Sequence, residues 1–186
     1  MFALPLGDRA ELRPLEPWRA EEFLANLDRC RAHIAPWVGA SFVAADLDGA
    51  RHVLRRYAER VATDSGGIWG IWLDGTLVGG VLFVSFDAAS GVAEAGCWLE
   101  ESAQGNGLVT RAVGYLLDWA FGVRGLSRVE WRTIAGNERS IAVARRLGMS
   151  RDGVLREVNP GPDGRLDDEI WSLLAREWRA GDPAGR

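Results

Sequence analysis

The most informative part of the sequence is WLEESAQGNGLVT, which covers residues 98–110. It predicts the end of a strand, a loop with two glycines, Gly105 and Gly107, and the start of a helix. Glycines let the backbone approach a ligand closely, and the free N–H groups at a helix N-terminus bind anions such as pyrophosphate. The loop would therefore suit a nucleotide-type ligand. A tight turn without a ligand is the alternative, which we favour for so short a motif taken alone.

The sequence on both sides of this loop is strongly periodic. Downstream, apolar pairs recur every four residues from Leu108 to Phe121 and predict a helix with a broad buried face. Upstream, residues 68–73, 77–86 and 92–99 predict three strands. The pair Asp74-Gly75 is a strong hairpin signal between the first two strands. Strands that follow one another through short turns indicate an antiparallel sheet, unlike the parallel unit of a dinucleotide-binding fold.

The rest of the chain adds elements of the same mixed kind. Further strands are predicted over residues 10–15, 129–134, 154–158 and 166–174, and further helices over 23–34, 47–61 and 138–147. Together they predict one α+β domain over residues 1–179, with about seven strands in a mostly antiparallel sheet and about four helices. Residues 180–186 are expected to form a flexible C-terminal tail.

Composition excludes several kinds of chemistry. The 186-residue chain has a net charge of −4 and an isoelectric point near 5.3, so we expect no nucleic acid partner. All 22 basic residues are arginines. A Walker A loop and a pyridoxal Schiff base are excluded, because both require a lysine. The only histidines, His33 and His52, leave little material for a catalytic triad or a zinc site, and we expect no metal.

Cysteine usage and hydropathy bear on the location of the protein. Cys30 and Cys97 lie in unrelated contexts, which fits a reducing compartment better than a disulfide framework. No apolar run approaches the roughly 20 residues of a membrane span, and the first residues lack the basic and apolar regions of a signal peptide. We therefore expect a cytoplasmic protein without a membrane partner.

Two blocks of sequence resemble a known family. The stretch QGNGLV (residues 104–109) resembles the Q/R-x-x-G-x-G/A loop of GNAT-type N-acyltransferases, and NERS (137–140) with RLGM (146–149) is similar to their second block. The best match is the RimJ/RimL-like branch, which is related to ribosomal-protein N-terminal acetyltransferases. The resemblance covers nearly the whole chain. Val109 and Met149 depart from the family pattern, which has a small residue and an aromatic residue there.

The resemblance implies an acyl-CoA site where two central strands of the sheet splay apart. Backbone groups of Cys97, Trp98 and Leu99 would bind the pantetheine arm and donate to the thioester oxygen. The pyrophosphate would lie on the loop formed by Gln104, Gly105, Asn106, Gly107, Leu108, Val109 and Thr110. Asn137 would bind the arm from the other side, although its position also fits a helix N-cap. Arg145 is a candidate for the 3′-phosphate of CoA, with a solvated helix face as the alternative.

Two residues are candidates for catalysis. Glu94 lies between apolar residues in the middle of a predicted strand, where a carboxylate is unusual unless it lines a cleft, and burial would raise its pKa toward that of a general base. An open-face glutamate, or one paired with an arginine, is the alternative. Many members of the family have a tyrosine at the position of Ala144. The resemblance instead assigns Ser140 to the sulfur of the leaving CoA; an ordinary residue of a first helical turn is the alternative.

The sequence thus predicts an enzyme that transfers an acetyl group, or another short acyl group such as succinyl, from acyl-CoA to a primary amine by direct attack in a ternary complex. A protein N-terminal α-amine and a small-molecule amine are both open as acceptors. A non-catalytic CoA-binding or regulatory module on the same fold is the rival interpretation. Trp37, Trp69 and Trp72 are either acceptor-pocket or core residues. The sequence does not decide whether the protein forms a homodimer.

Overall fold

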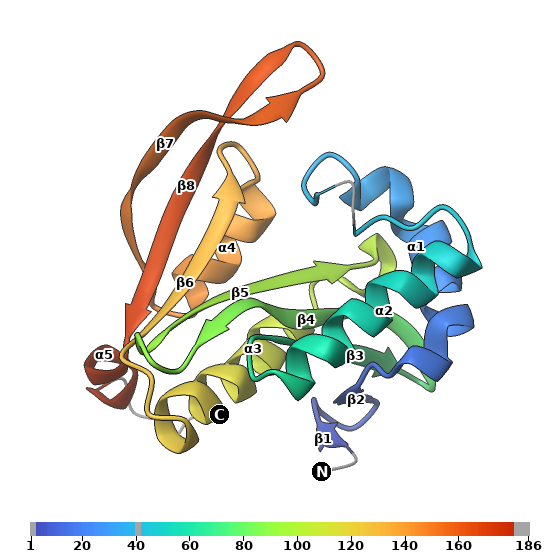
Figure 1. Ribbon diagram of the computed structural model, residues 1–186, viewed down its shortest axis with the longest axis horizontal. Helices are drawn as coiled ribbons and strands as arrows, with labels where there is room; N and C mark the ends of the chain where they lie inside the picture. The colour runs from blue at the N-terminus through green and yellow to red at the C-terminus, as the bar shows by residue number, and fades with distance from the viewer. Residues whose placement is uncertain (1–2, 40–41, 181–186) are drawn as a thin grey trace.

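One twisted sheet runs through the molecule. The computed structural model describes residues 3–39 and 42–180. The sheet has eight strands in the order β1-β2-β3-β4-β5-β6-β8-β7, and every neighbouring pair is antiparallel except β5 and β6. The strands are β1 (Leu4–Pro5), β2 (Ala10–Pro14), β3 (Gly67–Leu73), β4 (Thr76–Asp87), β5 (Val92–Leu99), β6 (Arg128–Ile134), β7 (Ser150–Gly161) and β8 (Gly164–Leu174). Figure 1 shows how β7 and β8 extend beyond the remainder of the sheet.

The hairpin of β3 and β4 forms as the sequence predicts. Asp74 and Gly75 both have positive φ, 49° and 77°, as the two central residues of a tight hairpin require. Within the strands, side chains alternate between the two faces of the sheet. Val81 and Phe83 consequently join one buried cluster and Leu82 joins the other.

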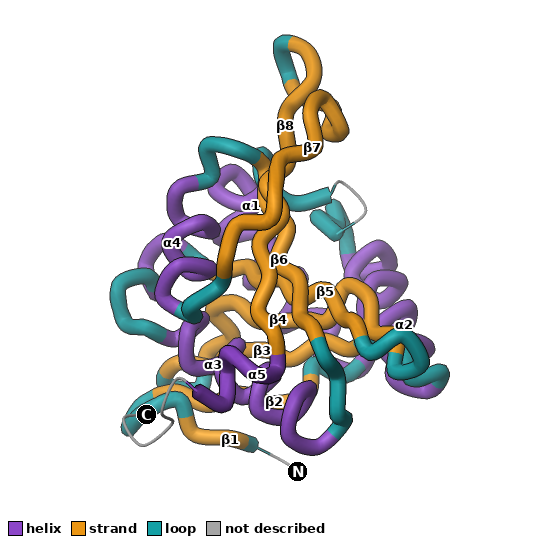
Figure 2. The backbone as a smooth tube through the Cα atoms, turned by 90° about the vertical axis from the view of Figure 1, so that its left-hand side faces the viewer, coloured by secondary structure: helices purple, strands orange, loops and turns teal. Residues whose placement is uncertain are grey.

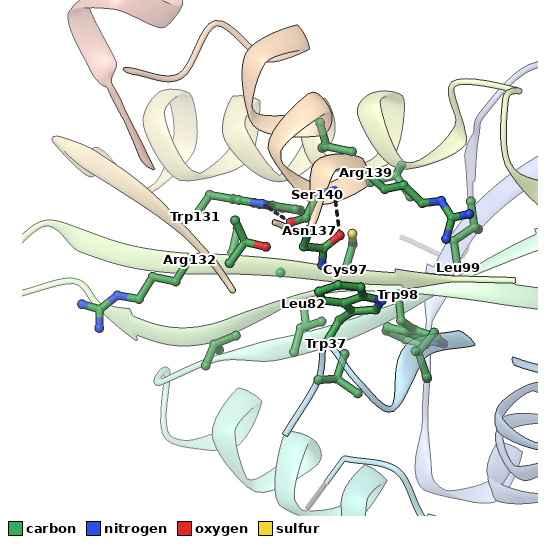
Figure 3. Close-up of a pocket in the computed structure, with 18 of the residues that line it drawn as sticks. Trp37, Leu82, Cys97, Trp98, Leu99, Trp131, Arg132, Asn137, Arg139 and Ser140 are labelled. Carbon is green, nitrogen blue, oxygen red and sulfur yellow. Dashed lines mark hydrogen bonds between the residues drawn. The ribbon is translucent and has the colours of Figure 1, made fainter. Parts of the chain in front are cut away.

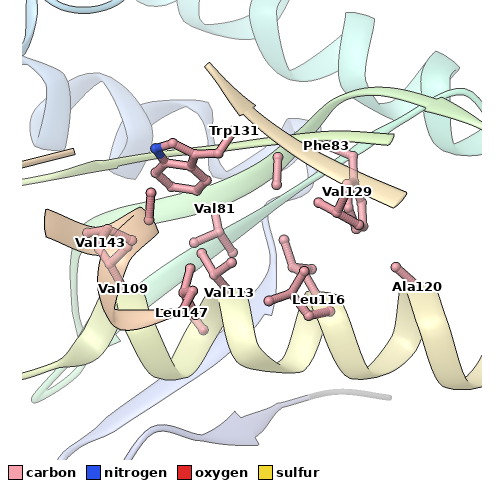
Figure 4. Close-up of a cluster of buried hydrophobic side chains, with 14 of the residues drawn as sticks. Val81, Phe83, Val109, Val113, Leu116, Ala120, Val129, Trp131, Val143 and Leu147 are labelled. Carbon is pink, nitrogen blue, oxygen red and sulfur yellow. The ribbon is translucent and has the colours of Figure 1, made fainter. Parts of the chain in front are cut away.

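Helices cover both faces of the sheet. They are α1 (Ala20–Ile34), α2 (Leu47–Ala62), α3 (Leu108–Asp118), α4 (Glu138–Arg146) and α5 (Ala175–Ala180). Figure 2 shows α3 and α4 on one side of the sheet and α2 on the other. The apolar face of α3 packs through Val113 and Leu116 on Val81, Phe83 and Val129 (Figure 4). The α1 and α2 helices pack on the opposite face around Phe23, Leu54 and Trp98.

The mixed α+β fold class is confirmed, and the details differ from the sequence prediction at several points. The described residues contain eight strands and five α-helices instead of about seven and four. The extra strand, β1, is only two residues long and therefore has no alternation to detect. The helix predicted to reach Phe121 ends at Asp118, and a π-helical turn over Trp119–Val123 continues it. The predicted tail contributes Ala180 to α5, and its residues 181–186 lie outside the described part.

The one parallel contact in the sheet creates its main irregularity. β5 pairs with β6 only from Val92 opposite Arg128 to Ala95 opposite Trp131. Beyond these pairs β5 stays with β4 as far as Leu99, whereas β6 stays with β8 as far as Ile134. The two strands therefore diverge in the middle of the sheet, as Figure 1 shows, and backbone groups on both facing edges lose their sheet partners.

Candidate active site

A cavity of about 740 Å³ lies where β5 and β6 diverge. Small-molecule sites occupy about 300–1,000 Å³, so the size suits a large organic ligand. On one face of the sheet its lining comes from α3, α4 and the loop before α3, and on the other from α1, α2 and the segment between them. Figure 3 shows Ser140 and Asn137 on one side of β5 and Trp37 on the other. The cavity thus opens toward both faces.

The edge of β5 presents backbone hydrogen-bonding groups to this cavity. The N–H of Glu100 donates to Val78 on β4, while the carbonyl of Gly91 accepts from Arg128 at the start of β6. Because alternate residues of a strand direct their backbone groups to opposite edges, Cys97 and Leu99 direct theirs away from β4 and toward the cavity. Trp98 points its backbone toward β4. Of the three residues predicted on this strand, two therefore offer backbone groups and Trp98 contributes its side chain to the wall.

The thiol of Cys97 contributes to the cavity wall as a packing group. Burial raises its pKa to about 12, so the thiol stays protonated at neutral pH. A protonated thiol is a weak nucleophile. Cys97 therefore packs in the cavity wall, and its thiol is not a candidate nucleophile.

The loop before α3 has the geometry of an anion site. Gly105 and Gly107 have φ of 79° and 66°, and no side chain caps the first turn of α3 at Gly107. The first N–H groups of that helix therefore keep their capacity to bind a ligand. Asn106 does not line the cavity; its side-chain amide donates to the carbonyls of Ala103 and Gln104 at 3.2 and 3.1 Å and fixes the loop.

The other predicted loop residues line the cavity, among them Gln104, Leu108, Val109 and Thr110. Val109, which departs from the family pattern, is 7% exposed, and Met149 is 5% exposed. Both side chains pack in the core around α3 and α4. Neither departure changes the backbone that faces the cavity.

The start of α4 brings Asn137 and Ser140 together. The side-chain oxygen of Asn137 accepts from the backbone N–H of Ser140 at 3.3 Å, so Asn137 is the N-cap of α4 and also lines the cavity. The indole N–H of Trp131 donates to the Ser140 hydroxyl oxygen at 2.9 Å (Figure 3). A hydroxyl that accepts in this way keeps its own hydrogen for another partner.

Glu94 lies on the opposite side of the sheet from Ser140. Its position on β5 is in phase with Trp98, which packs among α1 and α2. Burial raises the pKa of Glu94, the charges of Glu130 and Asp168 act in the same direction, and Arg132 opposes them. The nearest contact between Arg132 and Glu94 is 3.7 Å, beyond hydrogen-bond length. The carboxylate is therefore partly paired and destabilised by burial.

The structure does not bring Arg145 to the cavity. Its guanidinium lies over the ring of Trp171, 5.6 Å from the centroid. Successive residues of a helix point about 100° apart, so Arg145 and its neighbour Arg146 point in different directions. The next residue, Arg146, lines the cavity, as does Arg139 at the first turn of α4. Of the three tryptophans predicted to be either acceptor-pocket or core residues, Trp37 lines the cavity. Trp69 and Trp72 belong to the core.

Several residues at the site carry no signal in the sequence. Asn26 on α1 is fully buried and donates to the Glu100 carboxylate at 2.7 Å, while its oxygen accepts from the indole of Trp98 at 2.8 Å. Arg29 also donates to Glu100, at 2.9 Å. This network fixes the end of β5 against α1. On α2, Arg56, Tyr57 and Arg60 line the cavity near Glu94.

A family model of the acetyltransferase (GNAT) domain matches residues 9–150. The chain belongs to the GNAT acetyltransferase family. Its activity class is therefore acyl-CoA-dependent N-acyl transfer.

The similarity to individual GNAT proteins extends over nearly the whole chain. The "Putative ribosomal N-acetyltransferase YdaF" of Bacillus subtilis (strain 168) is 29% identical over 179 residues, 96% of this chain and 98% of YdaF. A solved structure of a "Probable acetyltransferase" has a TM-score of 0.86 at 28% identity and covers 96% of this chain and 99% of its own. The structure of RimL, a ribosomal L7/L12 α-N-protein acetyltransferase solved with coenzyme A, has a TM-score of 0.87 at 17% identity. The match covers 92% of this chain and 97% of the RimL chain. At that identity the likeness to RimL shows the fold alone.

Across residues 3–39 and 42–180, no group of three or more His, Cys, Asp and Glu side chains could hold a metal ion. Within the same ranges, no helix is long and apolar enough to cross a membrane.

Proposed function

We propose that the protein transfers an acetyl group from acetyl-CoA to the α-amine of a protein N-terminus, by direct attack in a ternary complex. The observation that carries this proposal is the cavity that opens toward both faces of the sheet. The uncapped start of α3 lies on one face and Glu94 lies on the other. A donor and an acceptor can thus enter from opposite sides and meet at the edge of β5.

The cleft residues fit acetyl-CoA as the donor. The loop at Gly105 and Gly107 and the first N–H groups of α3 would hold the pyrophosphate, because they offer backbone donors and a positive helix end without a lysine. The free edge of β5 would hold the pantetheine arm. Acetyl-CoA supplies a thioester whose carbonyl oxygen gains negative charge during attack. A backbone N–H of Cys97 or Leu99 would stabilise that charge.

Glu94 would accept the proton of the attacking amine. An α-amine with a pKa near 8 costs only about 1.4 kcal/mol to deprotonate at pH 7, against nearly 5 kcal/mol for a lysine side chain. A carboxylate whose pKa is raised by burial is sufficient for that task. The weak base at this position therefore favours an N-terminal α-amine over a lysine side chain.

Ser140 would donate to the sulfur of the leaving CoA. Its hydroxyl oxygen already accepts from Trp131, which leaves the O–H hydrogen for the sulfur. A thiol with a pKa near 8.5 leaves readily, so this hydrogen bond assists the reaction without being essential to it.

The name of one relative supports a protein acceptor. YdaF, 29% identical to this chain, is named a "Putative ribosomal N-acetyltransferase". By the same comparison we infer a location in the cytoplasm, where ribosomal proteins are made.

A thiol-release assay tests the proposal. Purified protein is mixed with acetyl-CoA or succinyl-CoA and with either short peptides that have a free N-terminus or small amines. We expect thiol release with acetyl-CoA and a free peptide N-terminus, and none with an N-terminally blocked peptide. A protein that gains thermal stability with CoA but releases no thiol with any amine would be a binding module instead. Turnover of small amines alone would exclude the protein acceptor.

A further inference from the structure

Two arginines of α2, Arg56 and Arg60, line the acceptor side of the cavity. They lie four residues apart and so share one face of the helix. Their guanidinium carbons lie over the ring of Tyr57, 5.5 and 5.6 Å from its centroid. Among the described residues, neither arginine forms an ion pair with a carboxylate.

The hydrogen bonds of these arginines are incomplete. Arg60 donates to the backbone carbonyl of Val84 on β4. The Nε of Arg56 is buried, and within the described part of the chain it has no hydrogen-bond partner. A buried donor without a partner is destabilising, and native proteins retain few of them unless a ligand or water satisfies them. The pair therefore has unused capacity to bind an acceptor group.

Glu94 lines the same cavity as the pair. Burial raises the pKa of Tyr57, the charges of Arg56 and Arg60 and a side-chain hydrogen bond with Arg56 lower it, and the charge of Glu94 raises it. The nearest arginine to Glu94, Arg132, is already shared with Glu130, to which it donates at 3.0 Å. Arg56 and Arg60 thus add positive charge to the cavity that also holds the proposed base, and no described carboxylate forms an ion pair with them.

This positive charge is separate from the arginines at the CoA end of the cleft. Figure 3 shows Arg139 and Arg132 at opposite ends, with Ser140 and Asn137 between them. Arg139 and Arg146 come from α4, on the face of the sheet that carries α3. Phosphates of CoA held at the start of α3 would meet that pair. The α2 pair faces the acceptor instead.

We propose that Arg56 and Arg60 bind a carboxylate of the acceptor, so that the enzyme selects amines with an acidic group close to the reacting nitrogen. This inference rests on the proposed function and narrows its acceptor to N-termini followed by an aspartate or glutamate. An arginine holds a carboxylate through two N–H groups in a fixed geometry, which would place the amine against Glu94 as well as attract it.

Binding to the CoA-loaded protein tests the proposal without requiring turnover. Calorimetry with saturating CoA compares two four-residue peptides that begin with Ser-Asp and Ser-Asn, and separately serine and serinamide. We expect at least about tenfold tighter binding of the acidic member of one pair, the ratio that one charged hydrogen bond gives. Tighter binding of the Ser-Asp peptide than of the Ser-Asn peptide shows that the arginines bind a side-chain carboxylate of a peptide acceptor. If only serine binds more tightly than serinamide, the acceptor is a small amino acid, and the protein N-terminus is excluded as acceptor.

Variants connect the preference to the arginines. Arg56→Gln and Arg60→Gln should each bring the ratio of the two Kd values, neutral ligand over acidic ligand, close to one. Arg60→Lys should retain part of the preference for the acidic ligand. Arg55→Gln is the matched control, since Arg55 is an exposed arginine of the same helix outside the cavity, and it should keep the full ratio. Thermal unfolding of each variant shows that it is folded. The proposal is overturned if the acidic and the neutral ligand bind equally in both pairs. It is also overturned if Arg56→Gln and Arg60→Gln leave the Kd ratio unchanged. Both outcomes are independent of whether the protein releases thiol.

Discussion

The indole N–H of Trp131 donates to the hydroxyl oxygen of Ser140 across 2.9 Å. Trp131 is on β6 and 1% exposed, so its position is set by the core, and it orients the hydroxyl at the start of α4. The orientation matters because, in the proposed reaction, the hydroxyl would donate to the CoA sulfur from a fixed place. A proton donor in position is expected to help even a good leaving group.

Ser140→Ala should therefore lower kcat about tenfold, a loss of about 1.4 kcal/mol in transition-state stabilisation, with little change in the KM for acetyl-CoA. Steady-state kinetics with the peptide acceptor measure both constants. The matched control is Ser85→Ala, because Ser85 is an exposed serine of β4 outside the cavity. If Ser140→Ala keeps the wild-type kcat, Ser140 does not assist the departure of CoA. If only the KM for acetyl-CoA rises, Ser140 contributes to binding and not to the chemical step.

Glu94→Gln should remove the acid limb that the carboxylate contributes to the pH profile of kcat/KM. Burial raises the pKa of Glu94, and below that value the protonated group cannot accept a proton. The variant should lose about tenfold to a hundredfold in rate, at the low end for a general base because the α-amine is easily deprotonated. Glu59→Gln, an exposed glutamate of α2, serves as the control. An unchanged acid limb in Glu94→Gln would assign it to another group.

The same carboxylate links stability to pH. Because the folded-state pKa of Glu94 is raised, its folded form binds more protons than its unfolded form at pH values between the two pKa values. Its contribution to stability is present below the unfolded pKa of about 4.3 and is lost as pH rises through the folded value. The Tm of Glu94→Gln relative to the parent should therefore increase from pH 4 upward. A difference that stays flat with pH would contradict the raised pKa.

Gly105→Ala should weaken CoA binding more than it weakens the fold. Gly105 has φ of 79°, and an added Cβ would meet no protein atom within 4 Å, so it would project into open space that the proposed CoA site includes. Gly75 at the β3–β4 turn is a matched control, with φ of 77° and the same open surroundings. Both alanine variants should lose about 1 kcal/mol of stability, but only Gly105→Ala should raise the Kd of CoA, about tenfold. Equal Kd values for both variants would show that the loop is only a turn.

The sequence predicts the elements better than the contacts between them. The β3–β4 hairpin is predictable, since Asp74 and Gly75 adopt the positive φ that their turn requires. The divergence of β5 from β6 is implied by the family resemblance alone and not by the residue pattern, because the four residue pairs that join these strands come from segments separated by α3. The network of Asn26 and Glu100 joins residues 74 positions apart, and a lone asparagine within a helix pattern carries no sign of that partner.

Neighbouring residues of α4 show the same limit. Helical periodicity places Arg145 and Arg146 on different faces, but the docking of α4 on the sheet decides which of them meets the cavity. Arg146→Gln should raise the Kd of CoA about tenfold through the loss of one charged contact. Arg145→Gln should lose only its stacking on Trp171, about 0.5–1 kcal/mol of stability, and leave the Kd within twofold. Calorimetric titration with CoA measures both, and the reverse order would return the phosphate role to Arg145.

Asn26→Ala should destabilise the protein by about 2–4 kcal/mol, because it leaves the buried Trp98 indole N–H without a partner and removes one of the two donors to Glu100. For a chain of this length that loss lowers Tm by roughly 4–16 °C. Asp28→Ala on the same helix breaks only the exposed pair with Arg31 and should cost less than about 1 kcal/mol. Thermal and denaturant unfolding give both values. A loss below 1 kcal/mol for Asn26→Ala would mean that water replaces the amide, and the end of β5 would then need another explanation for its fixed position against α1.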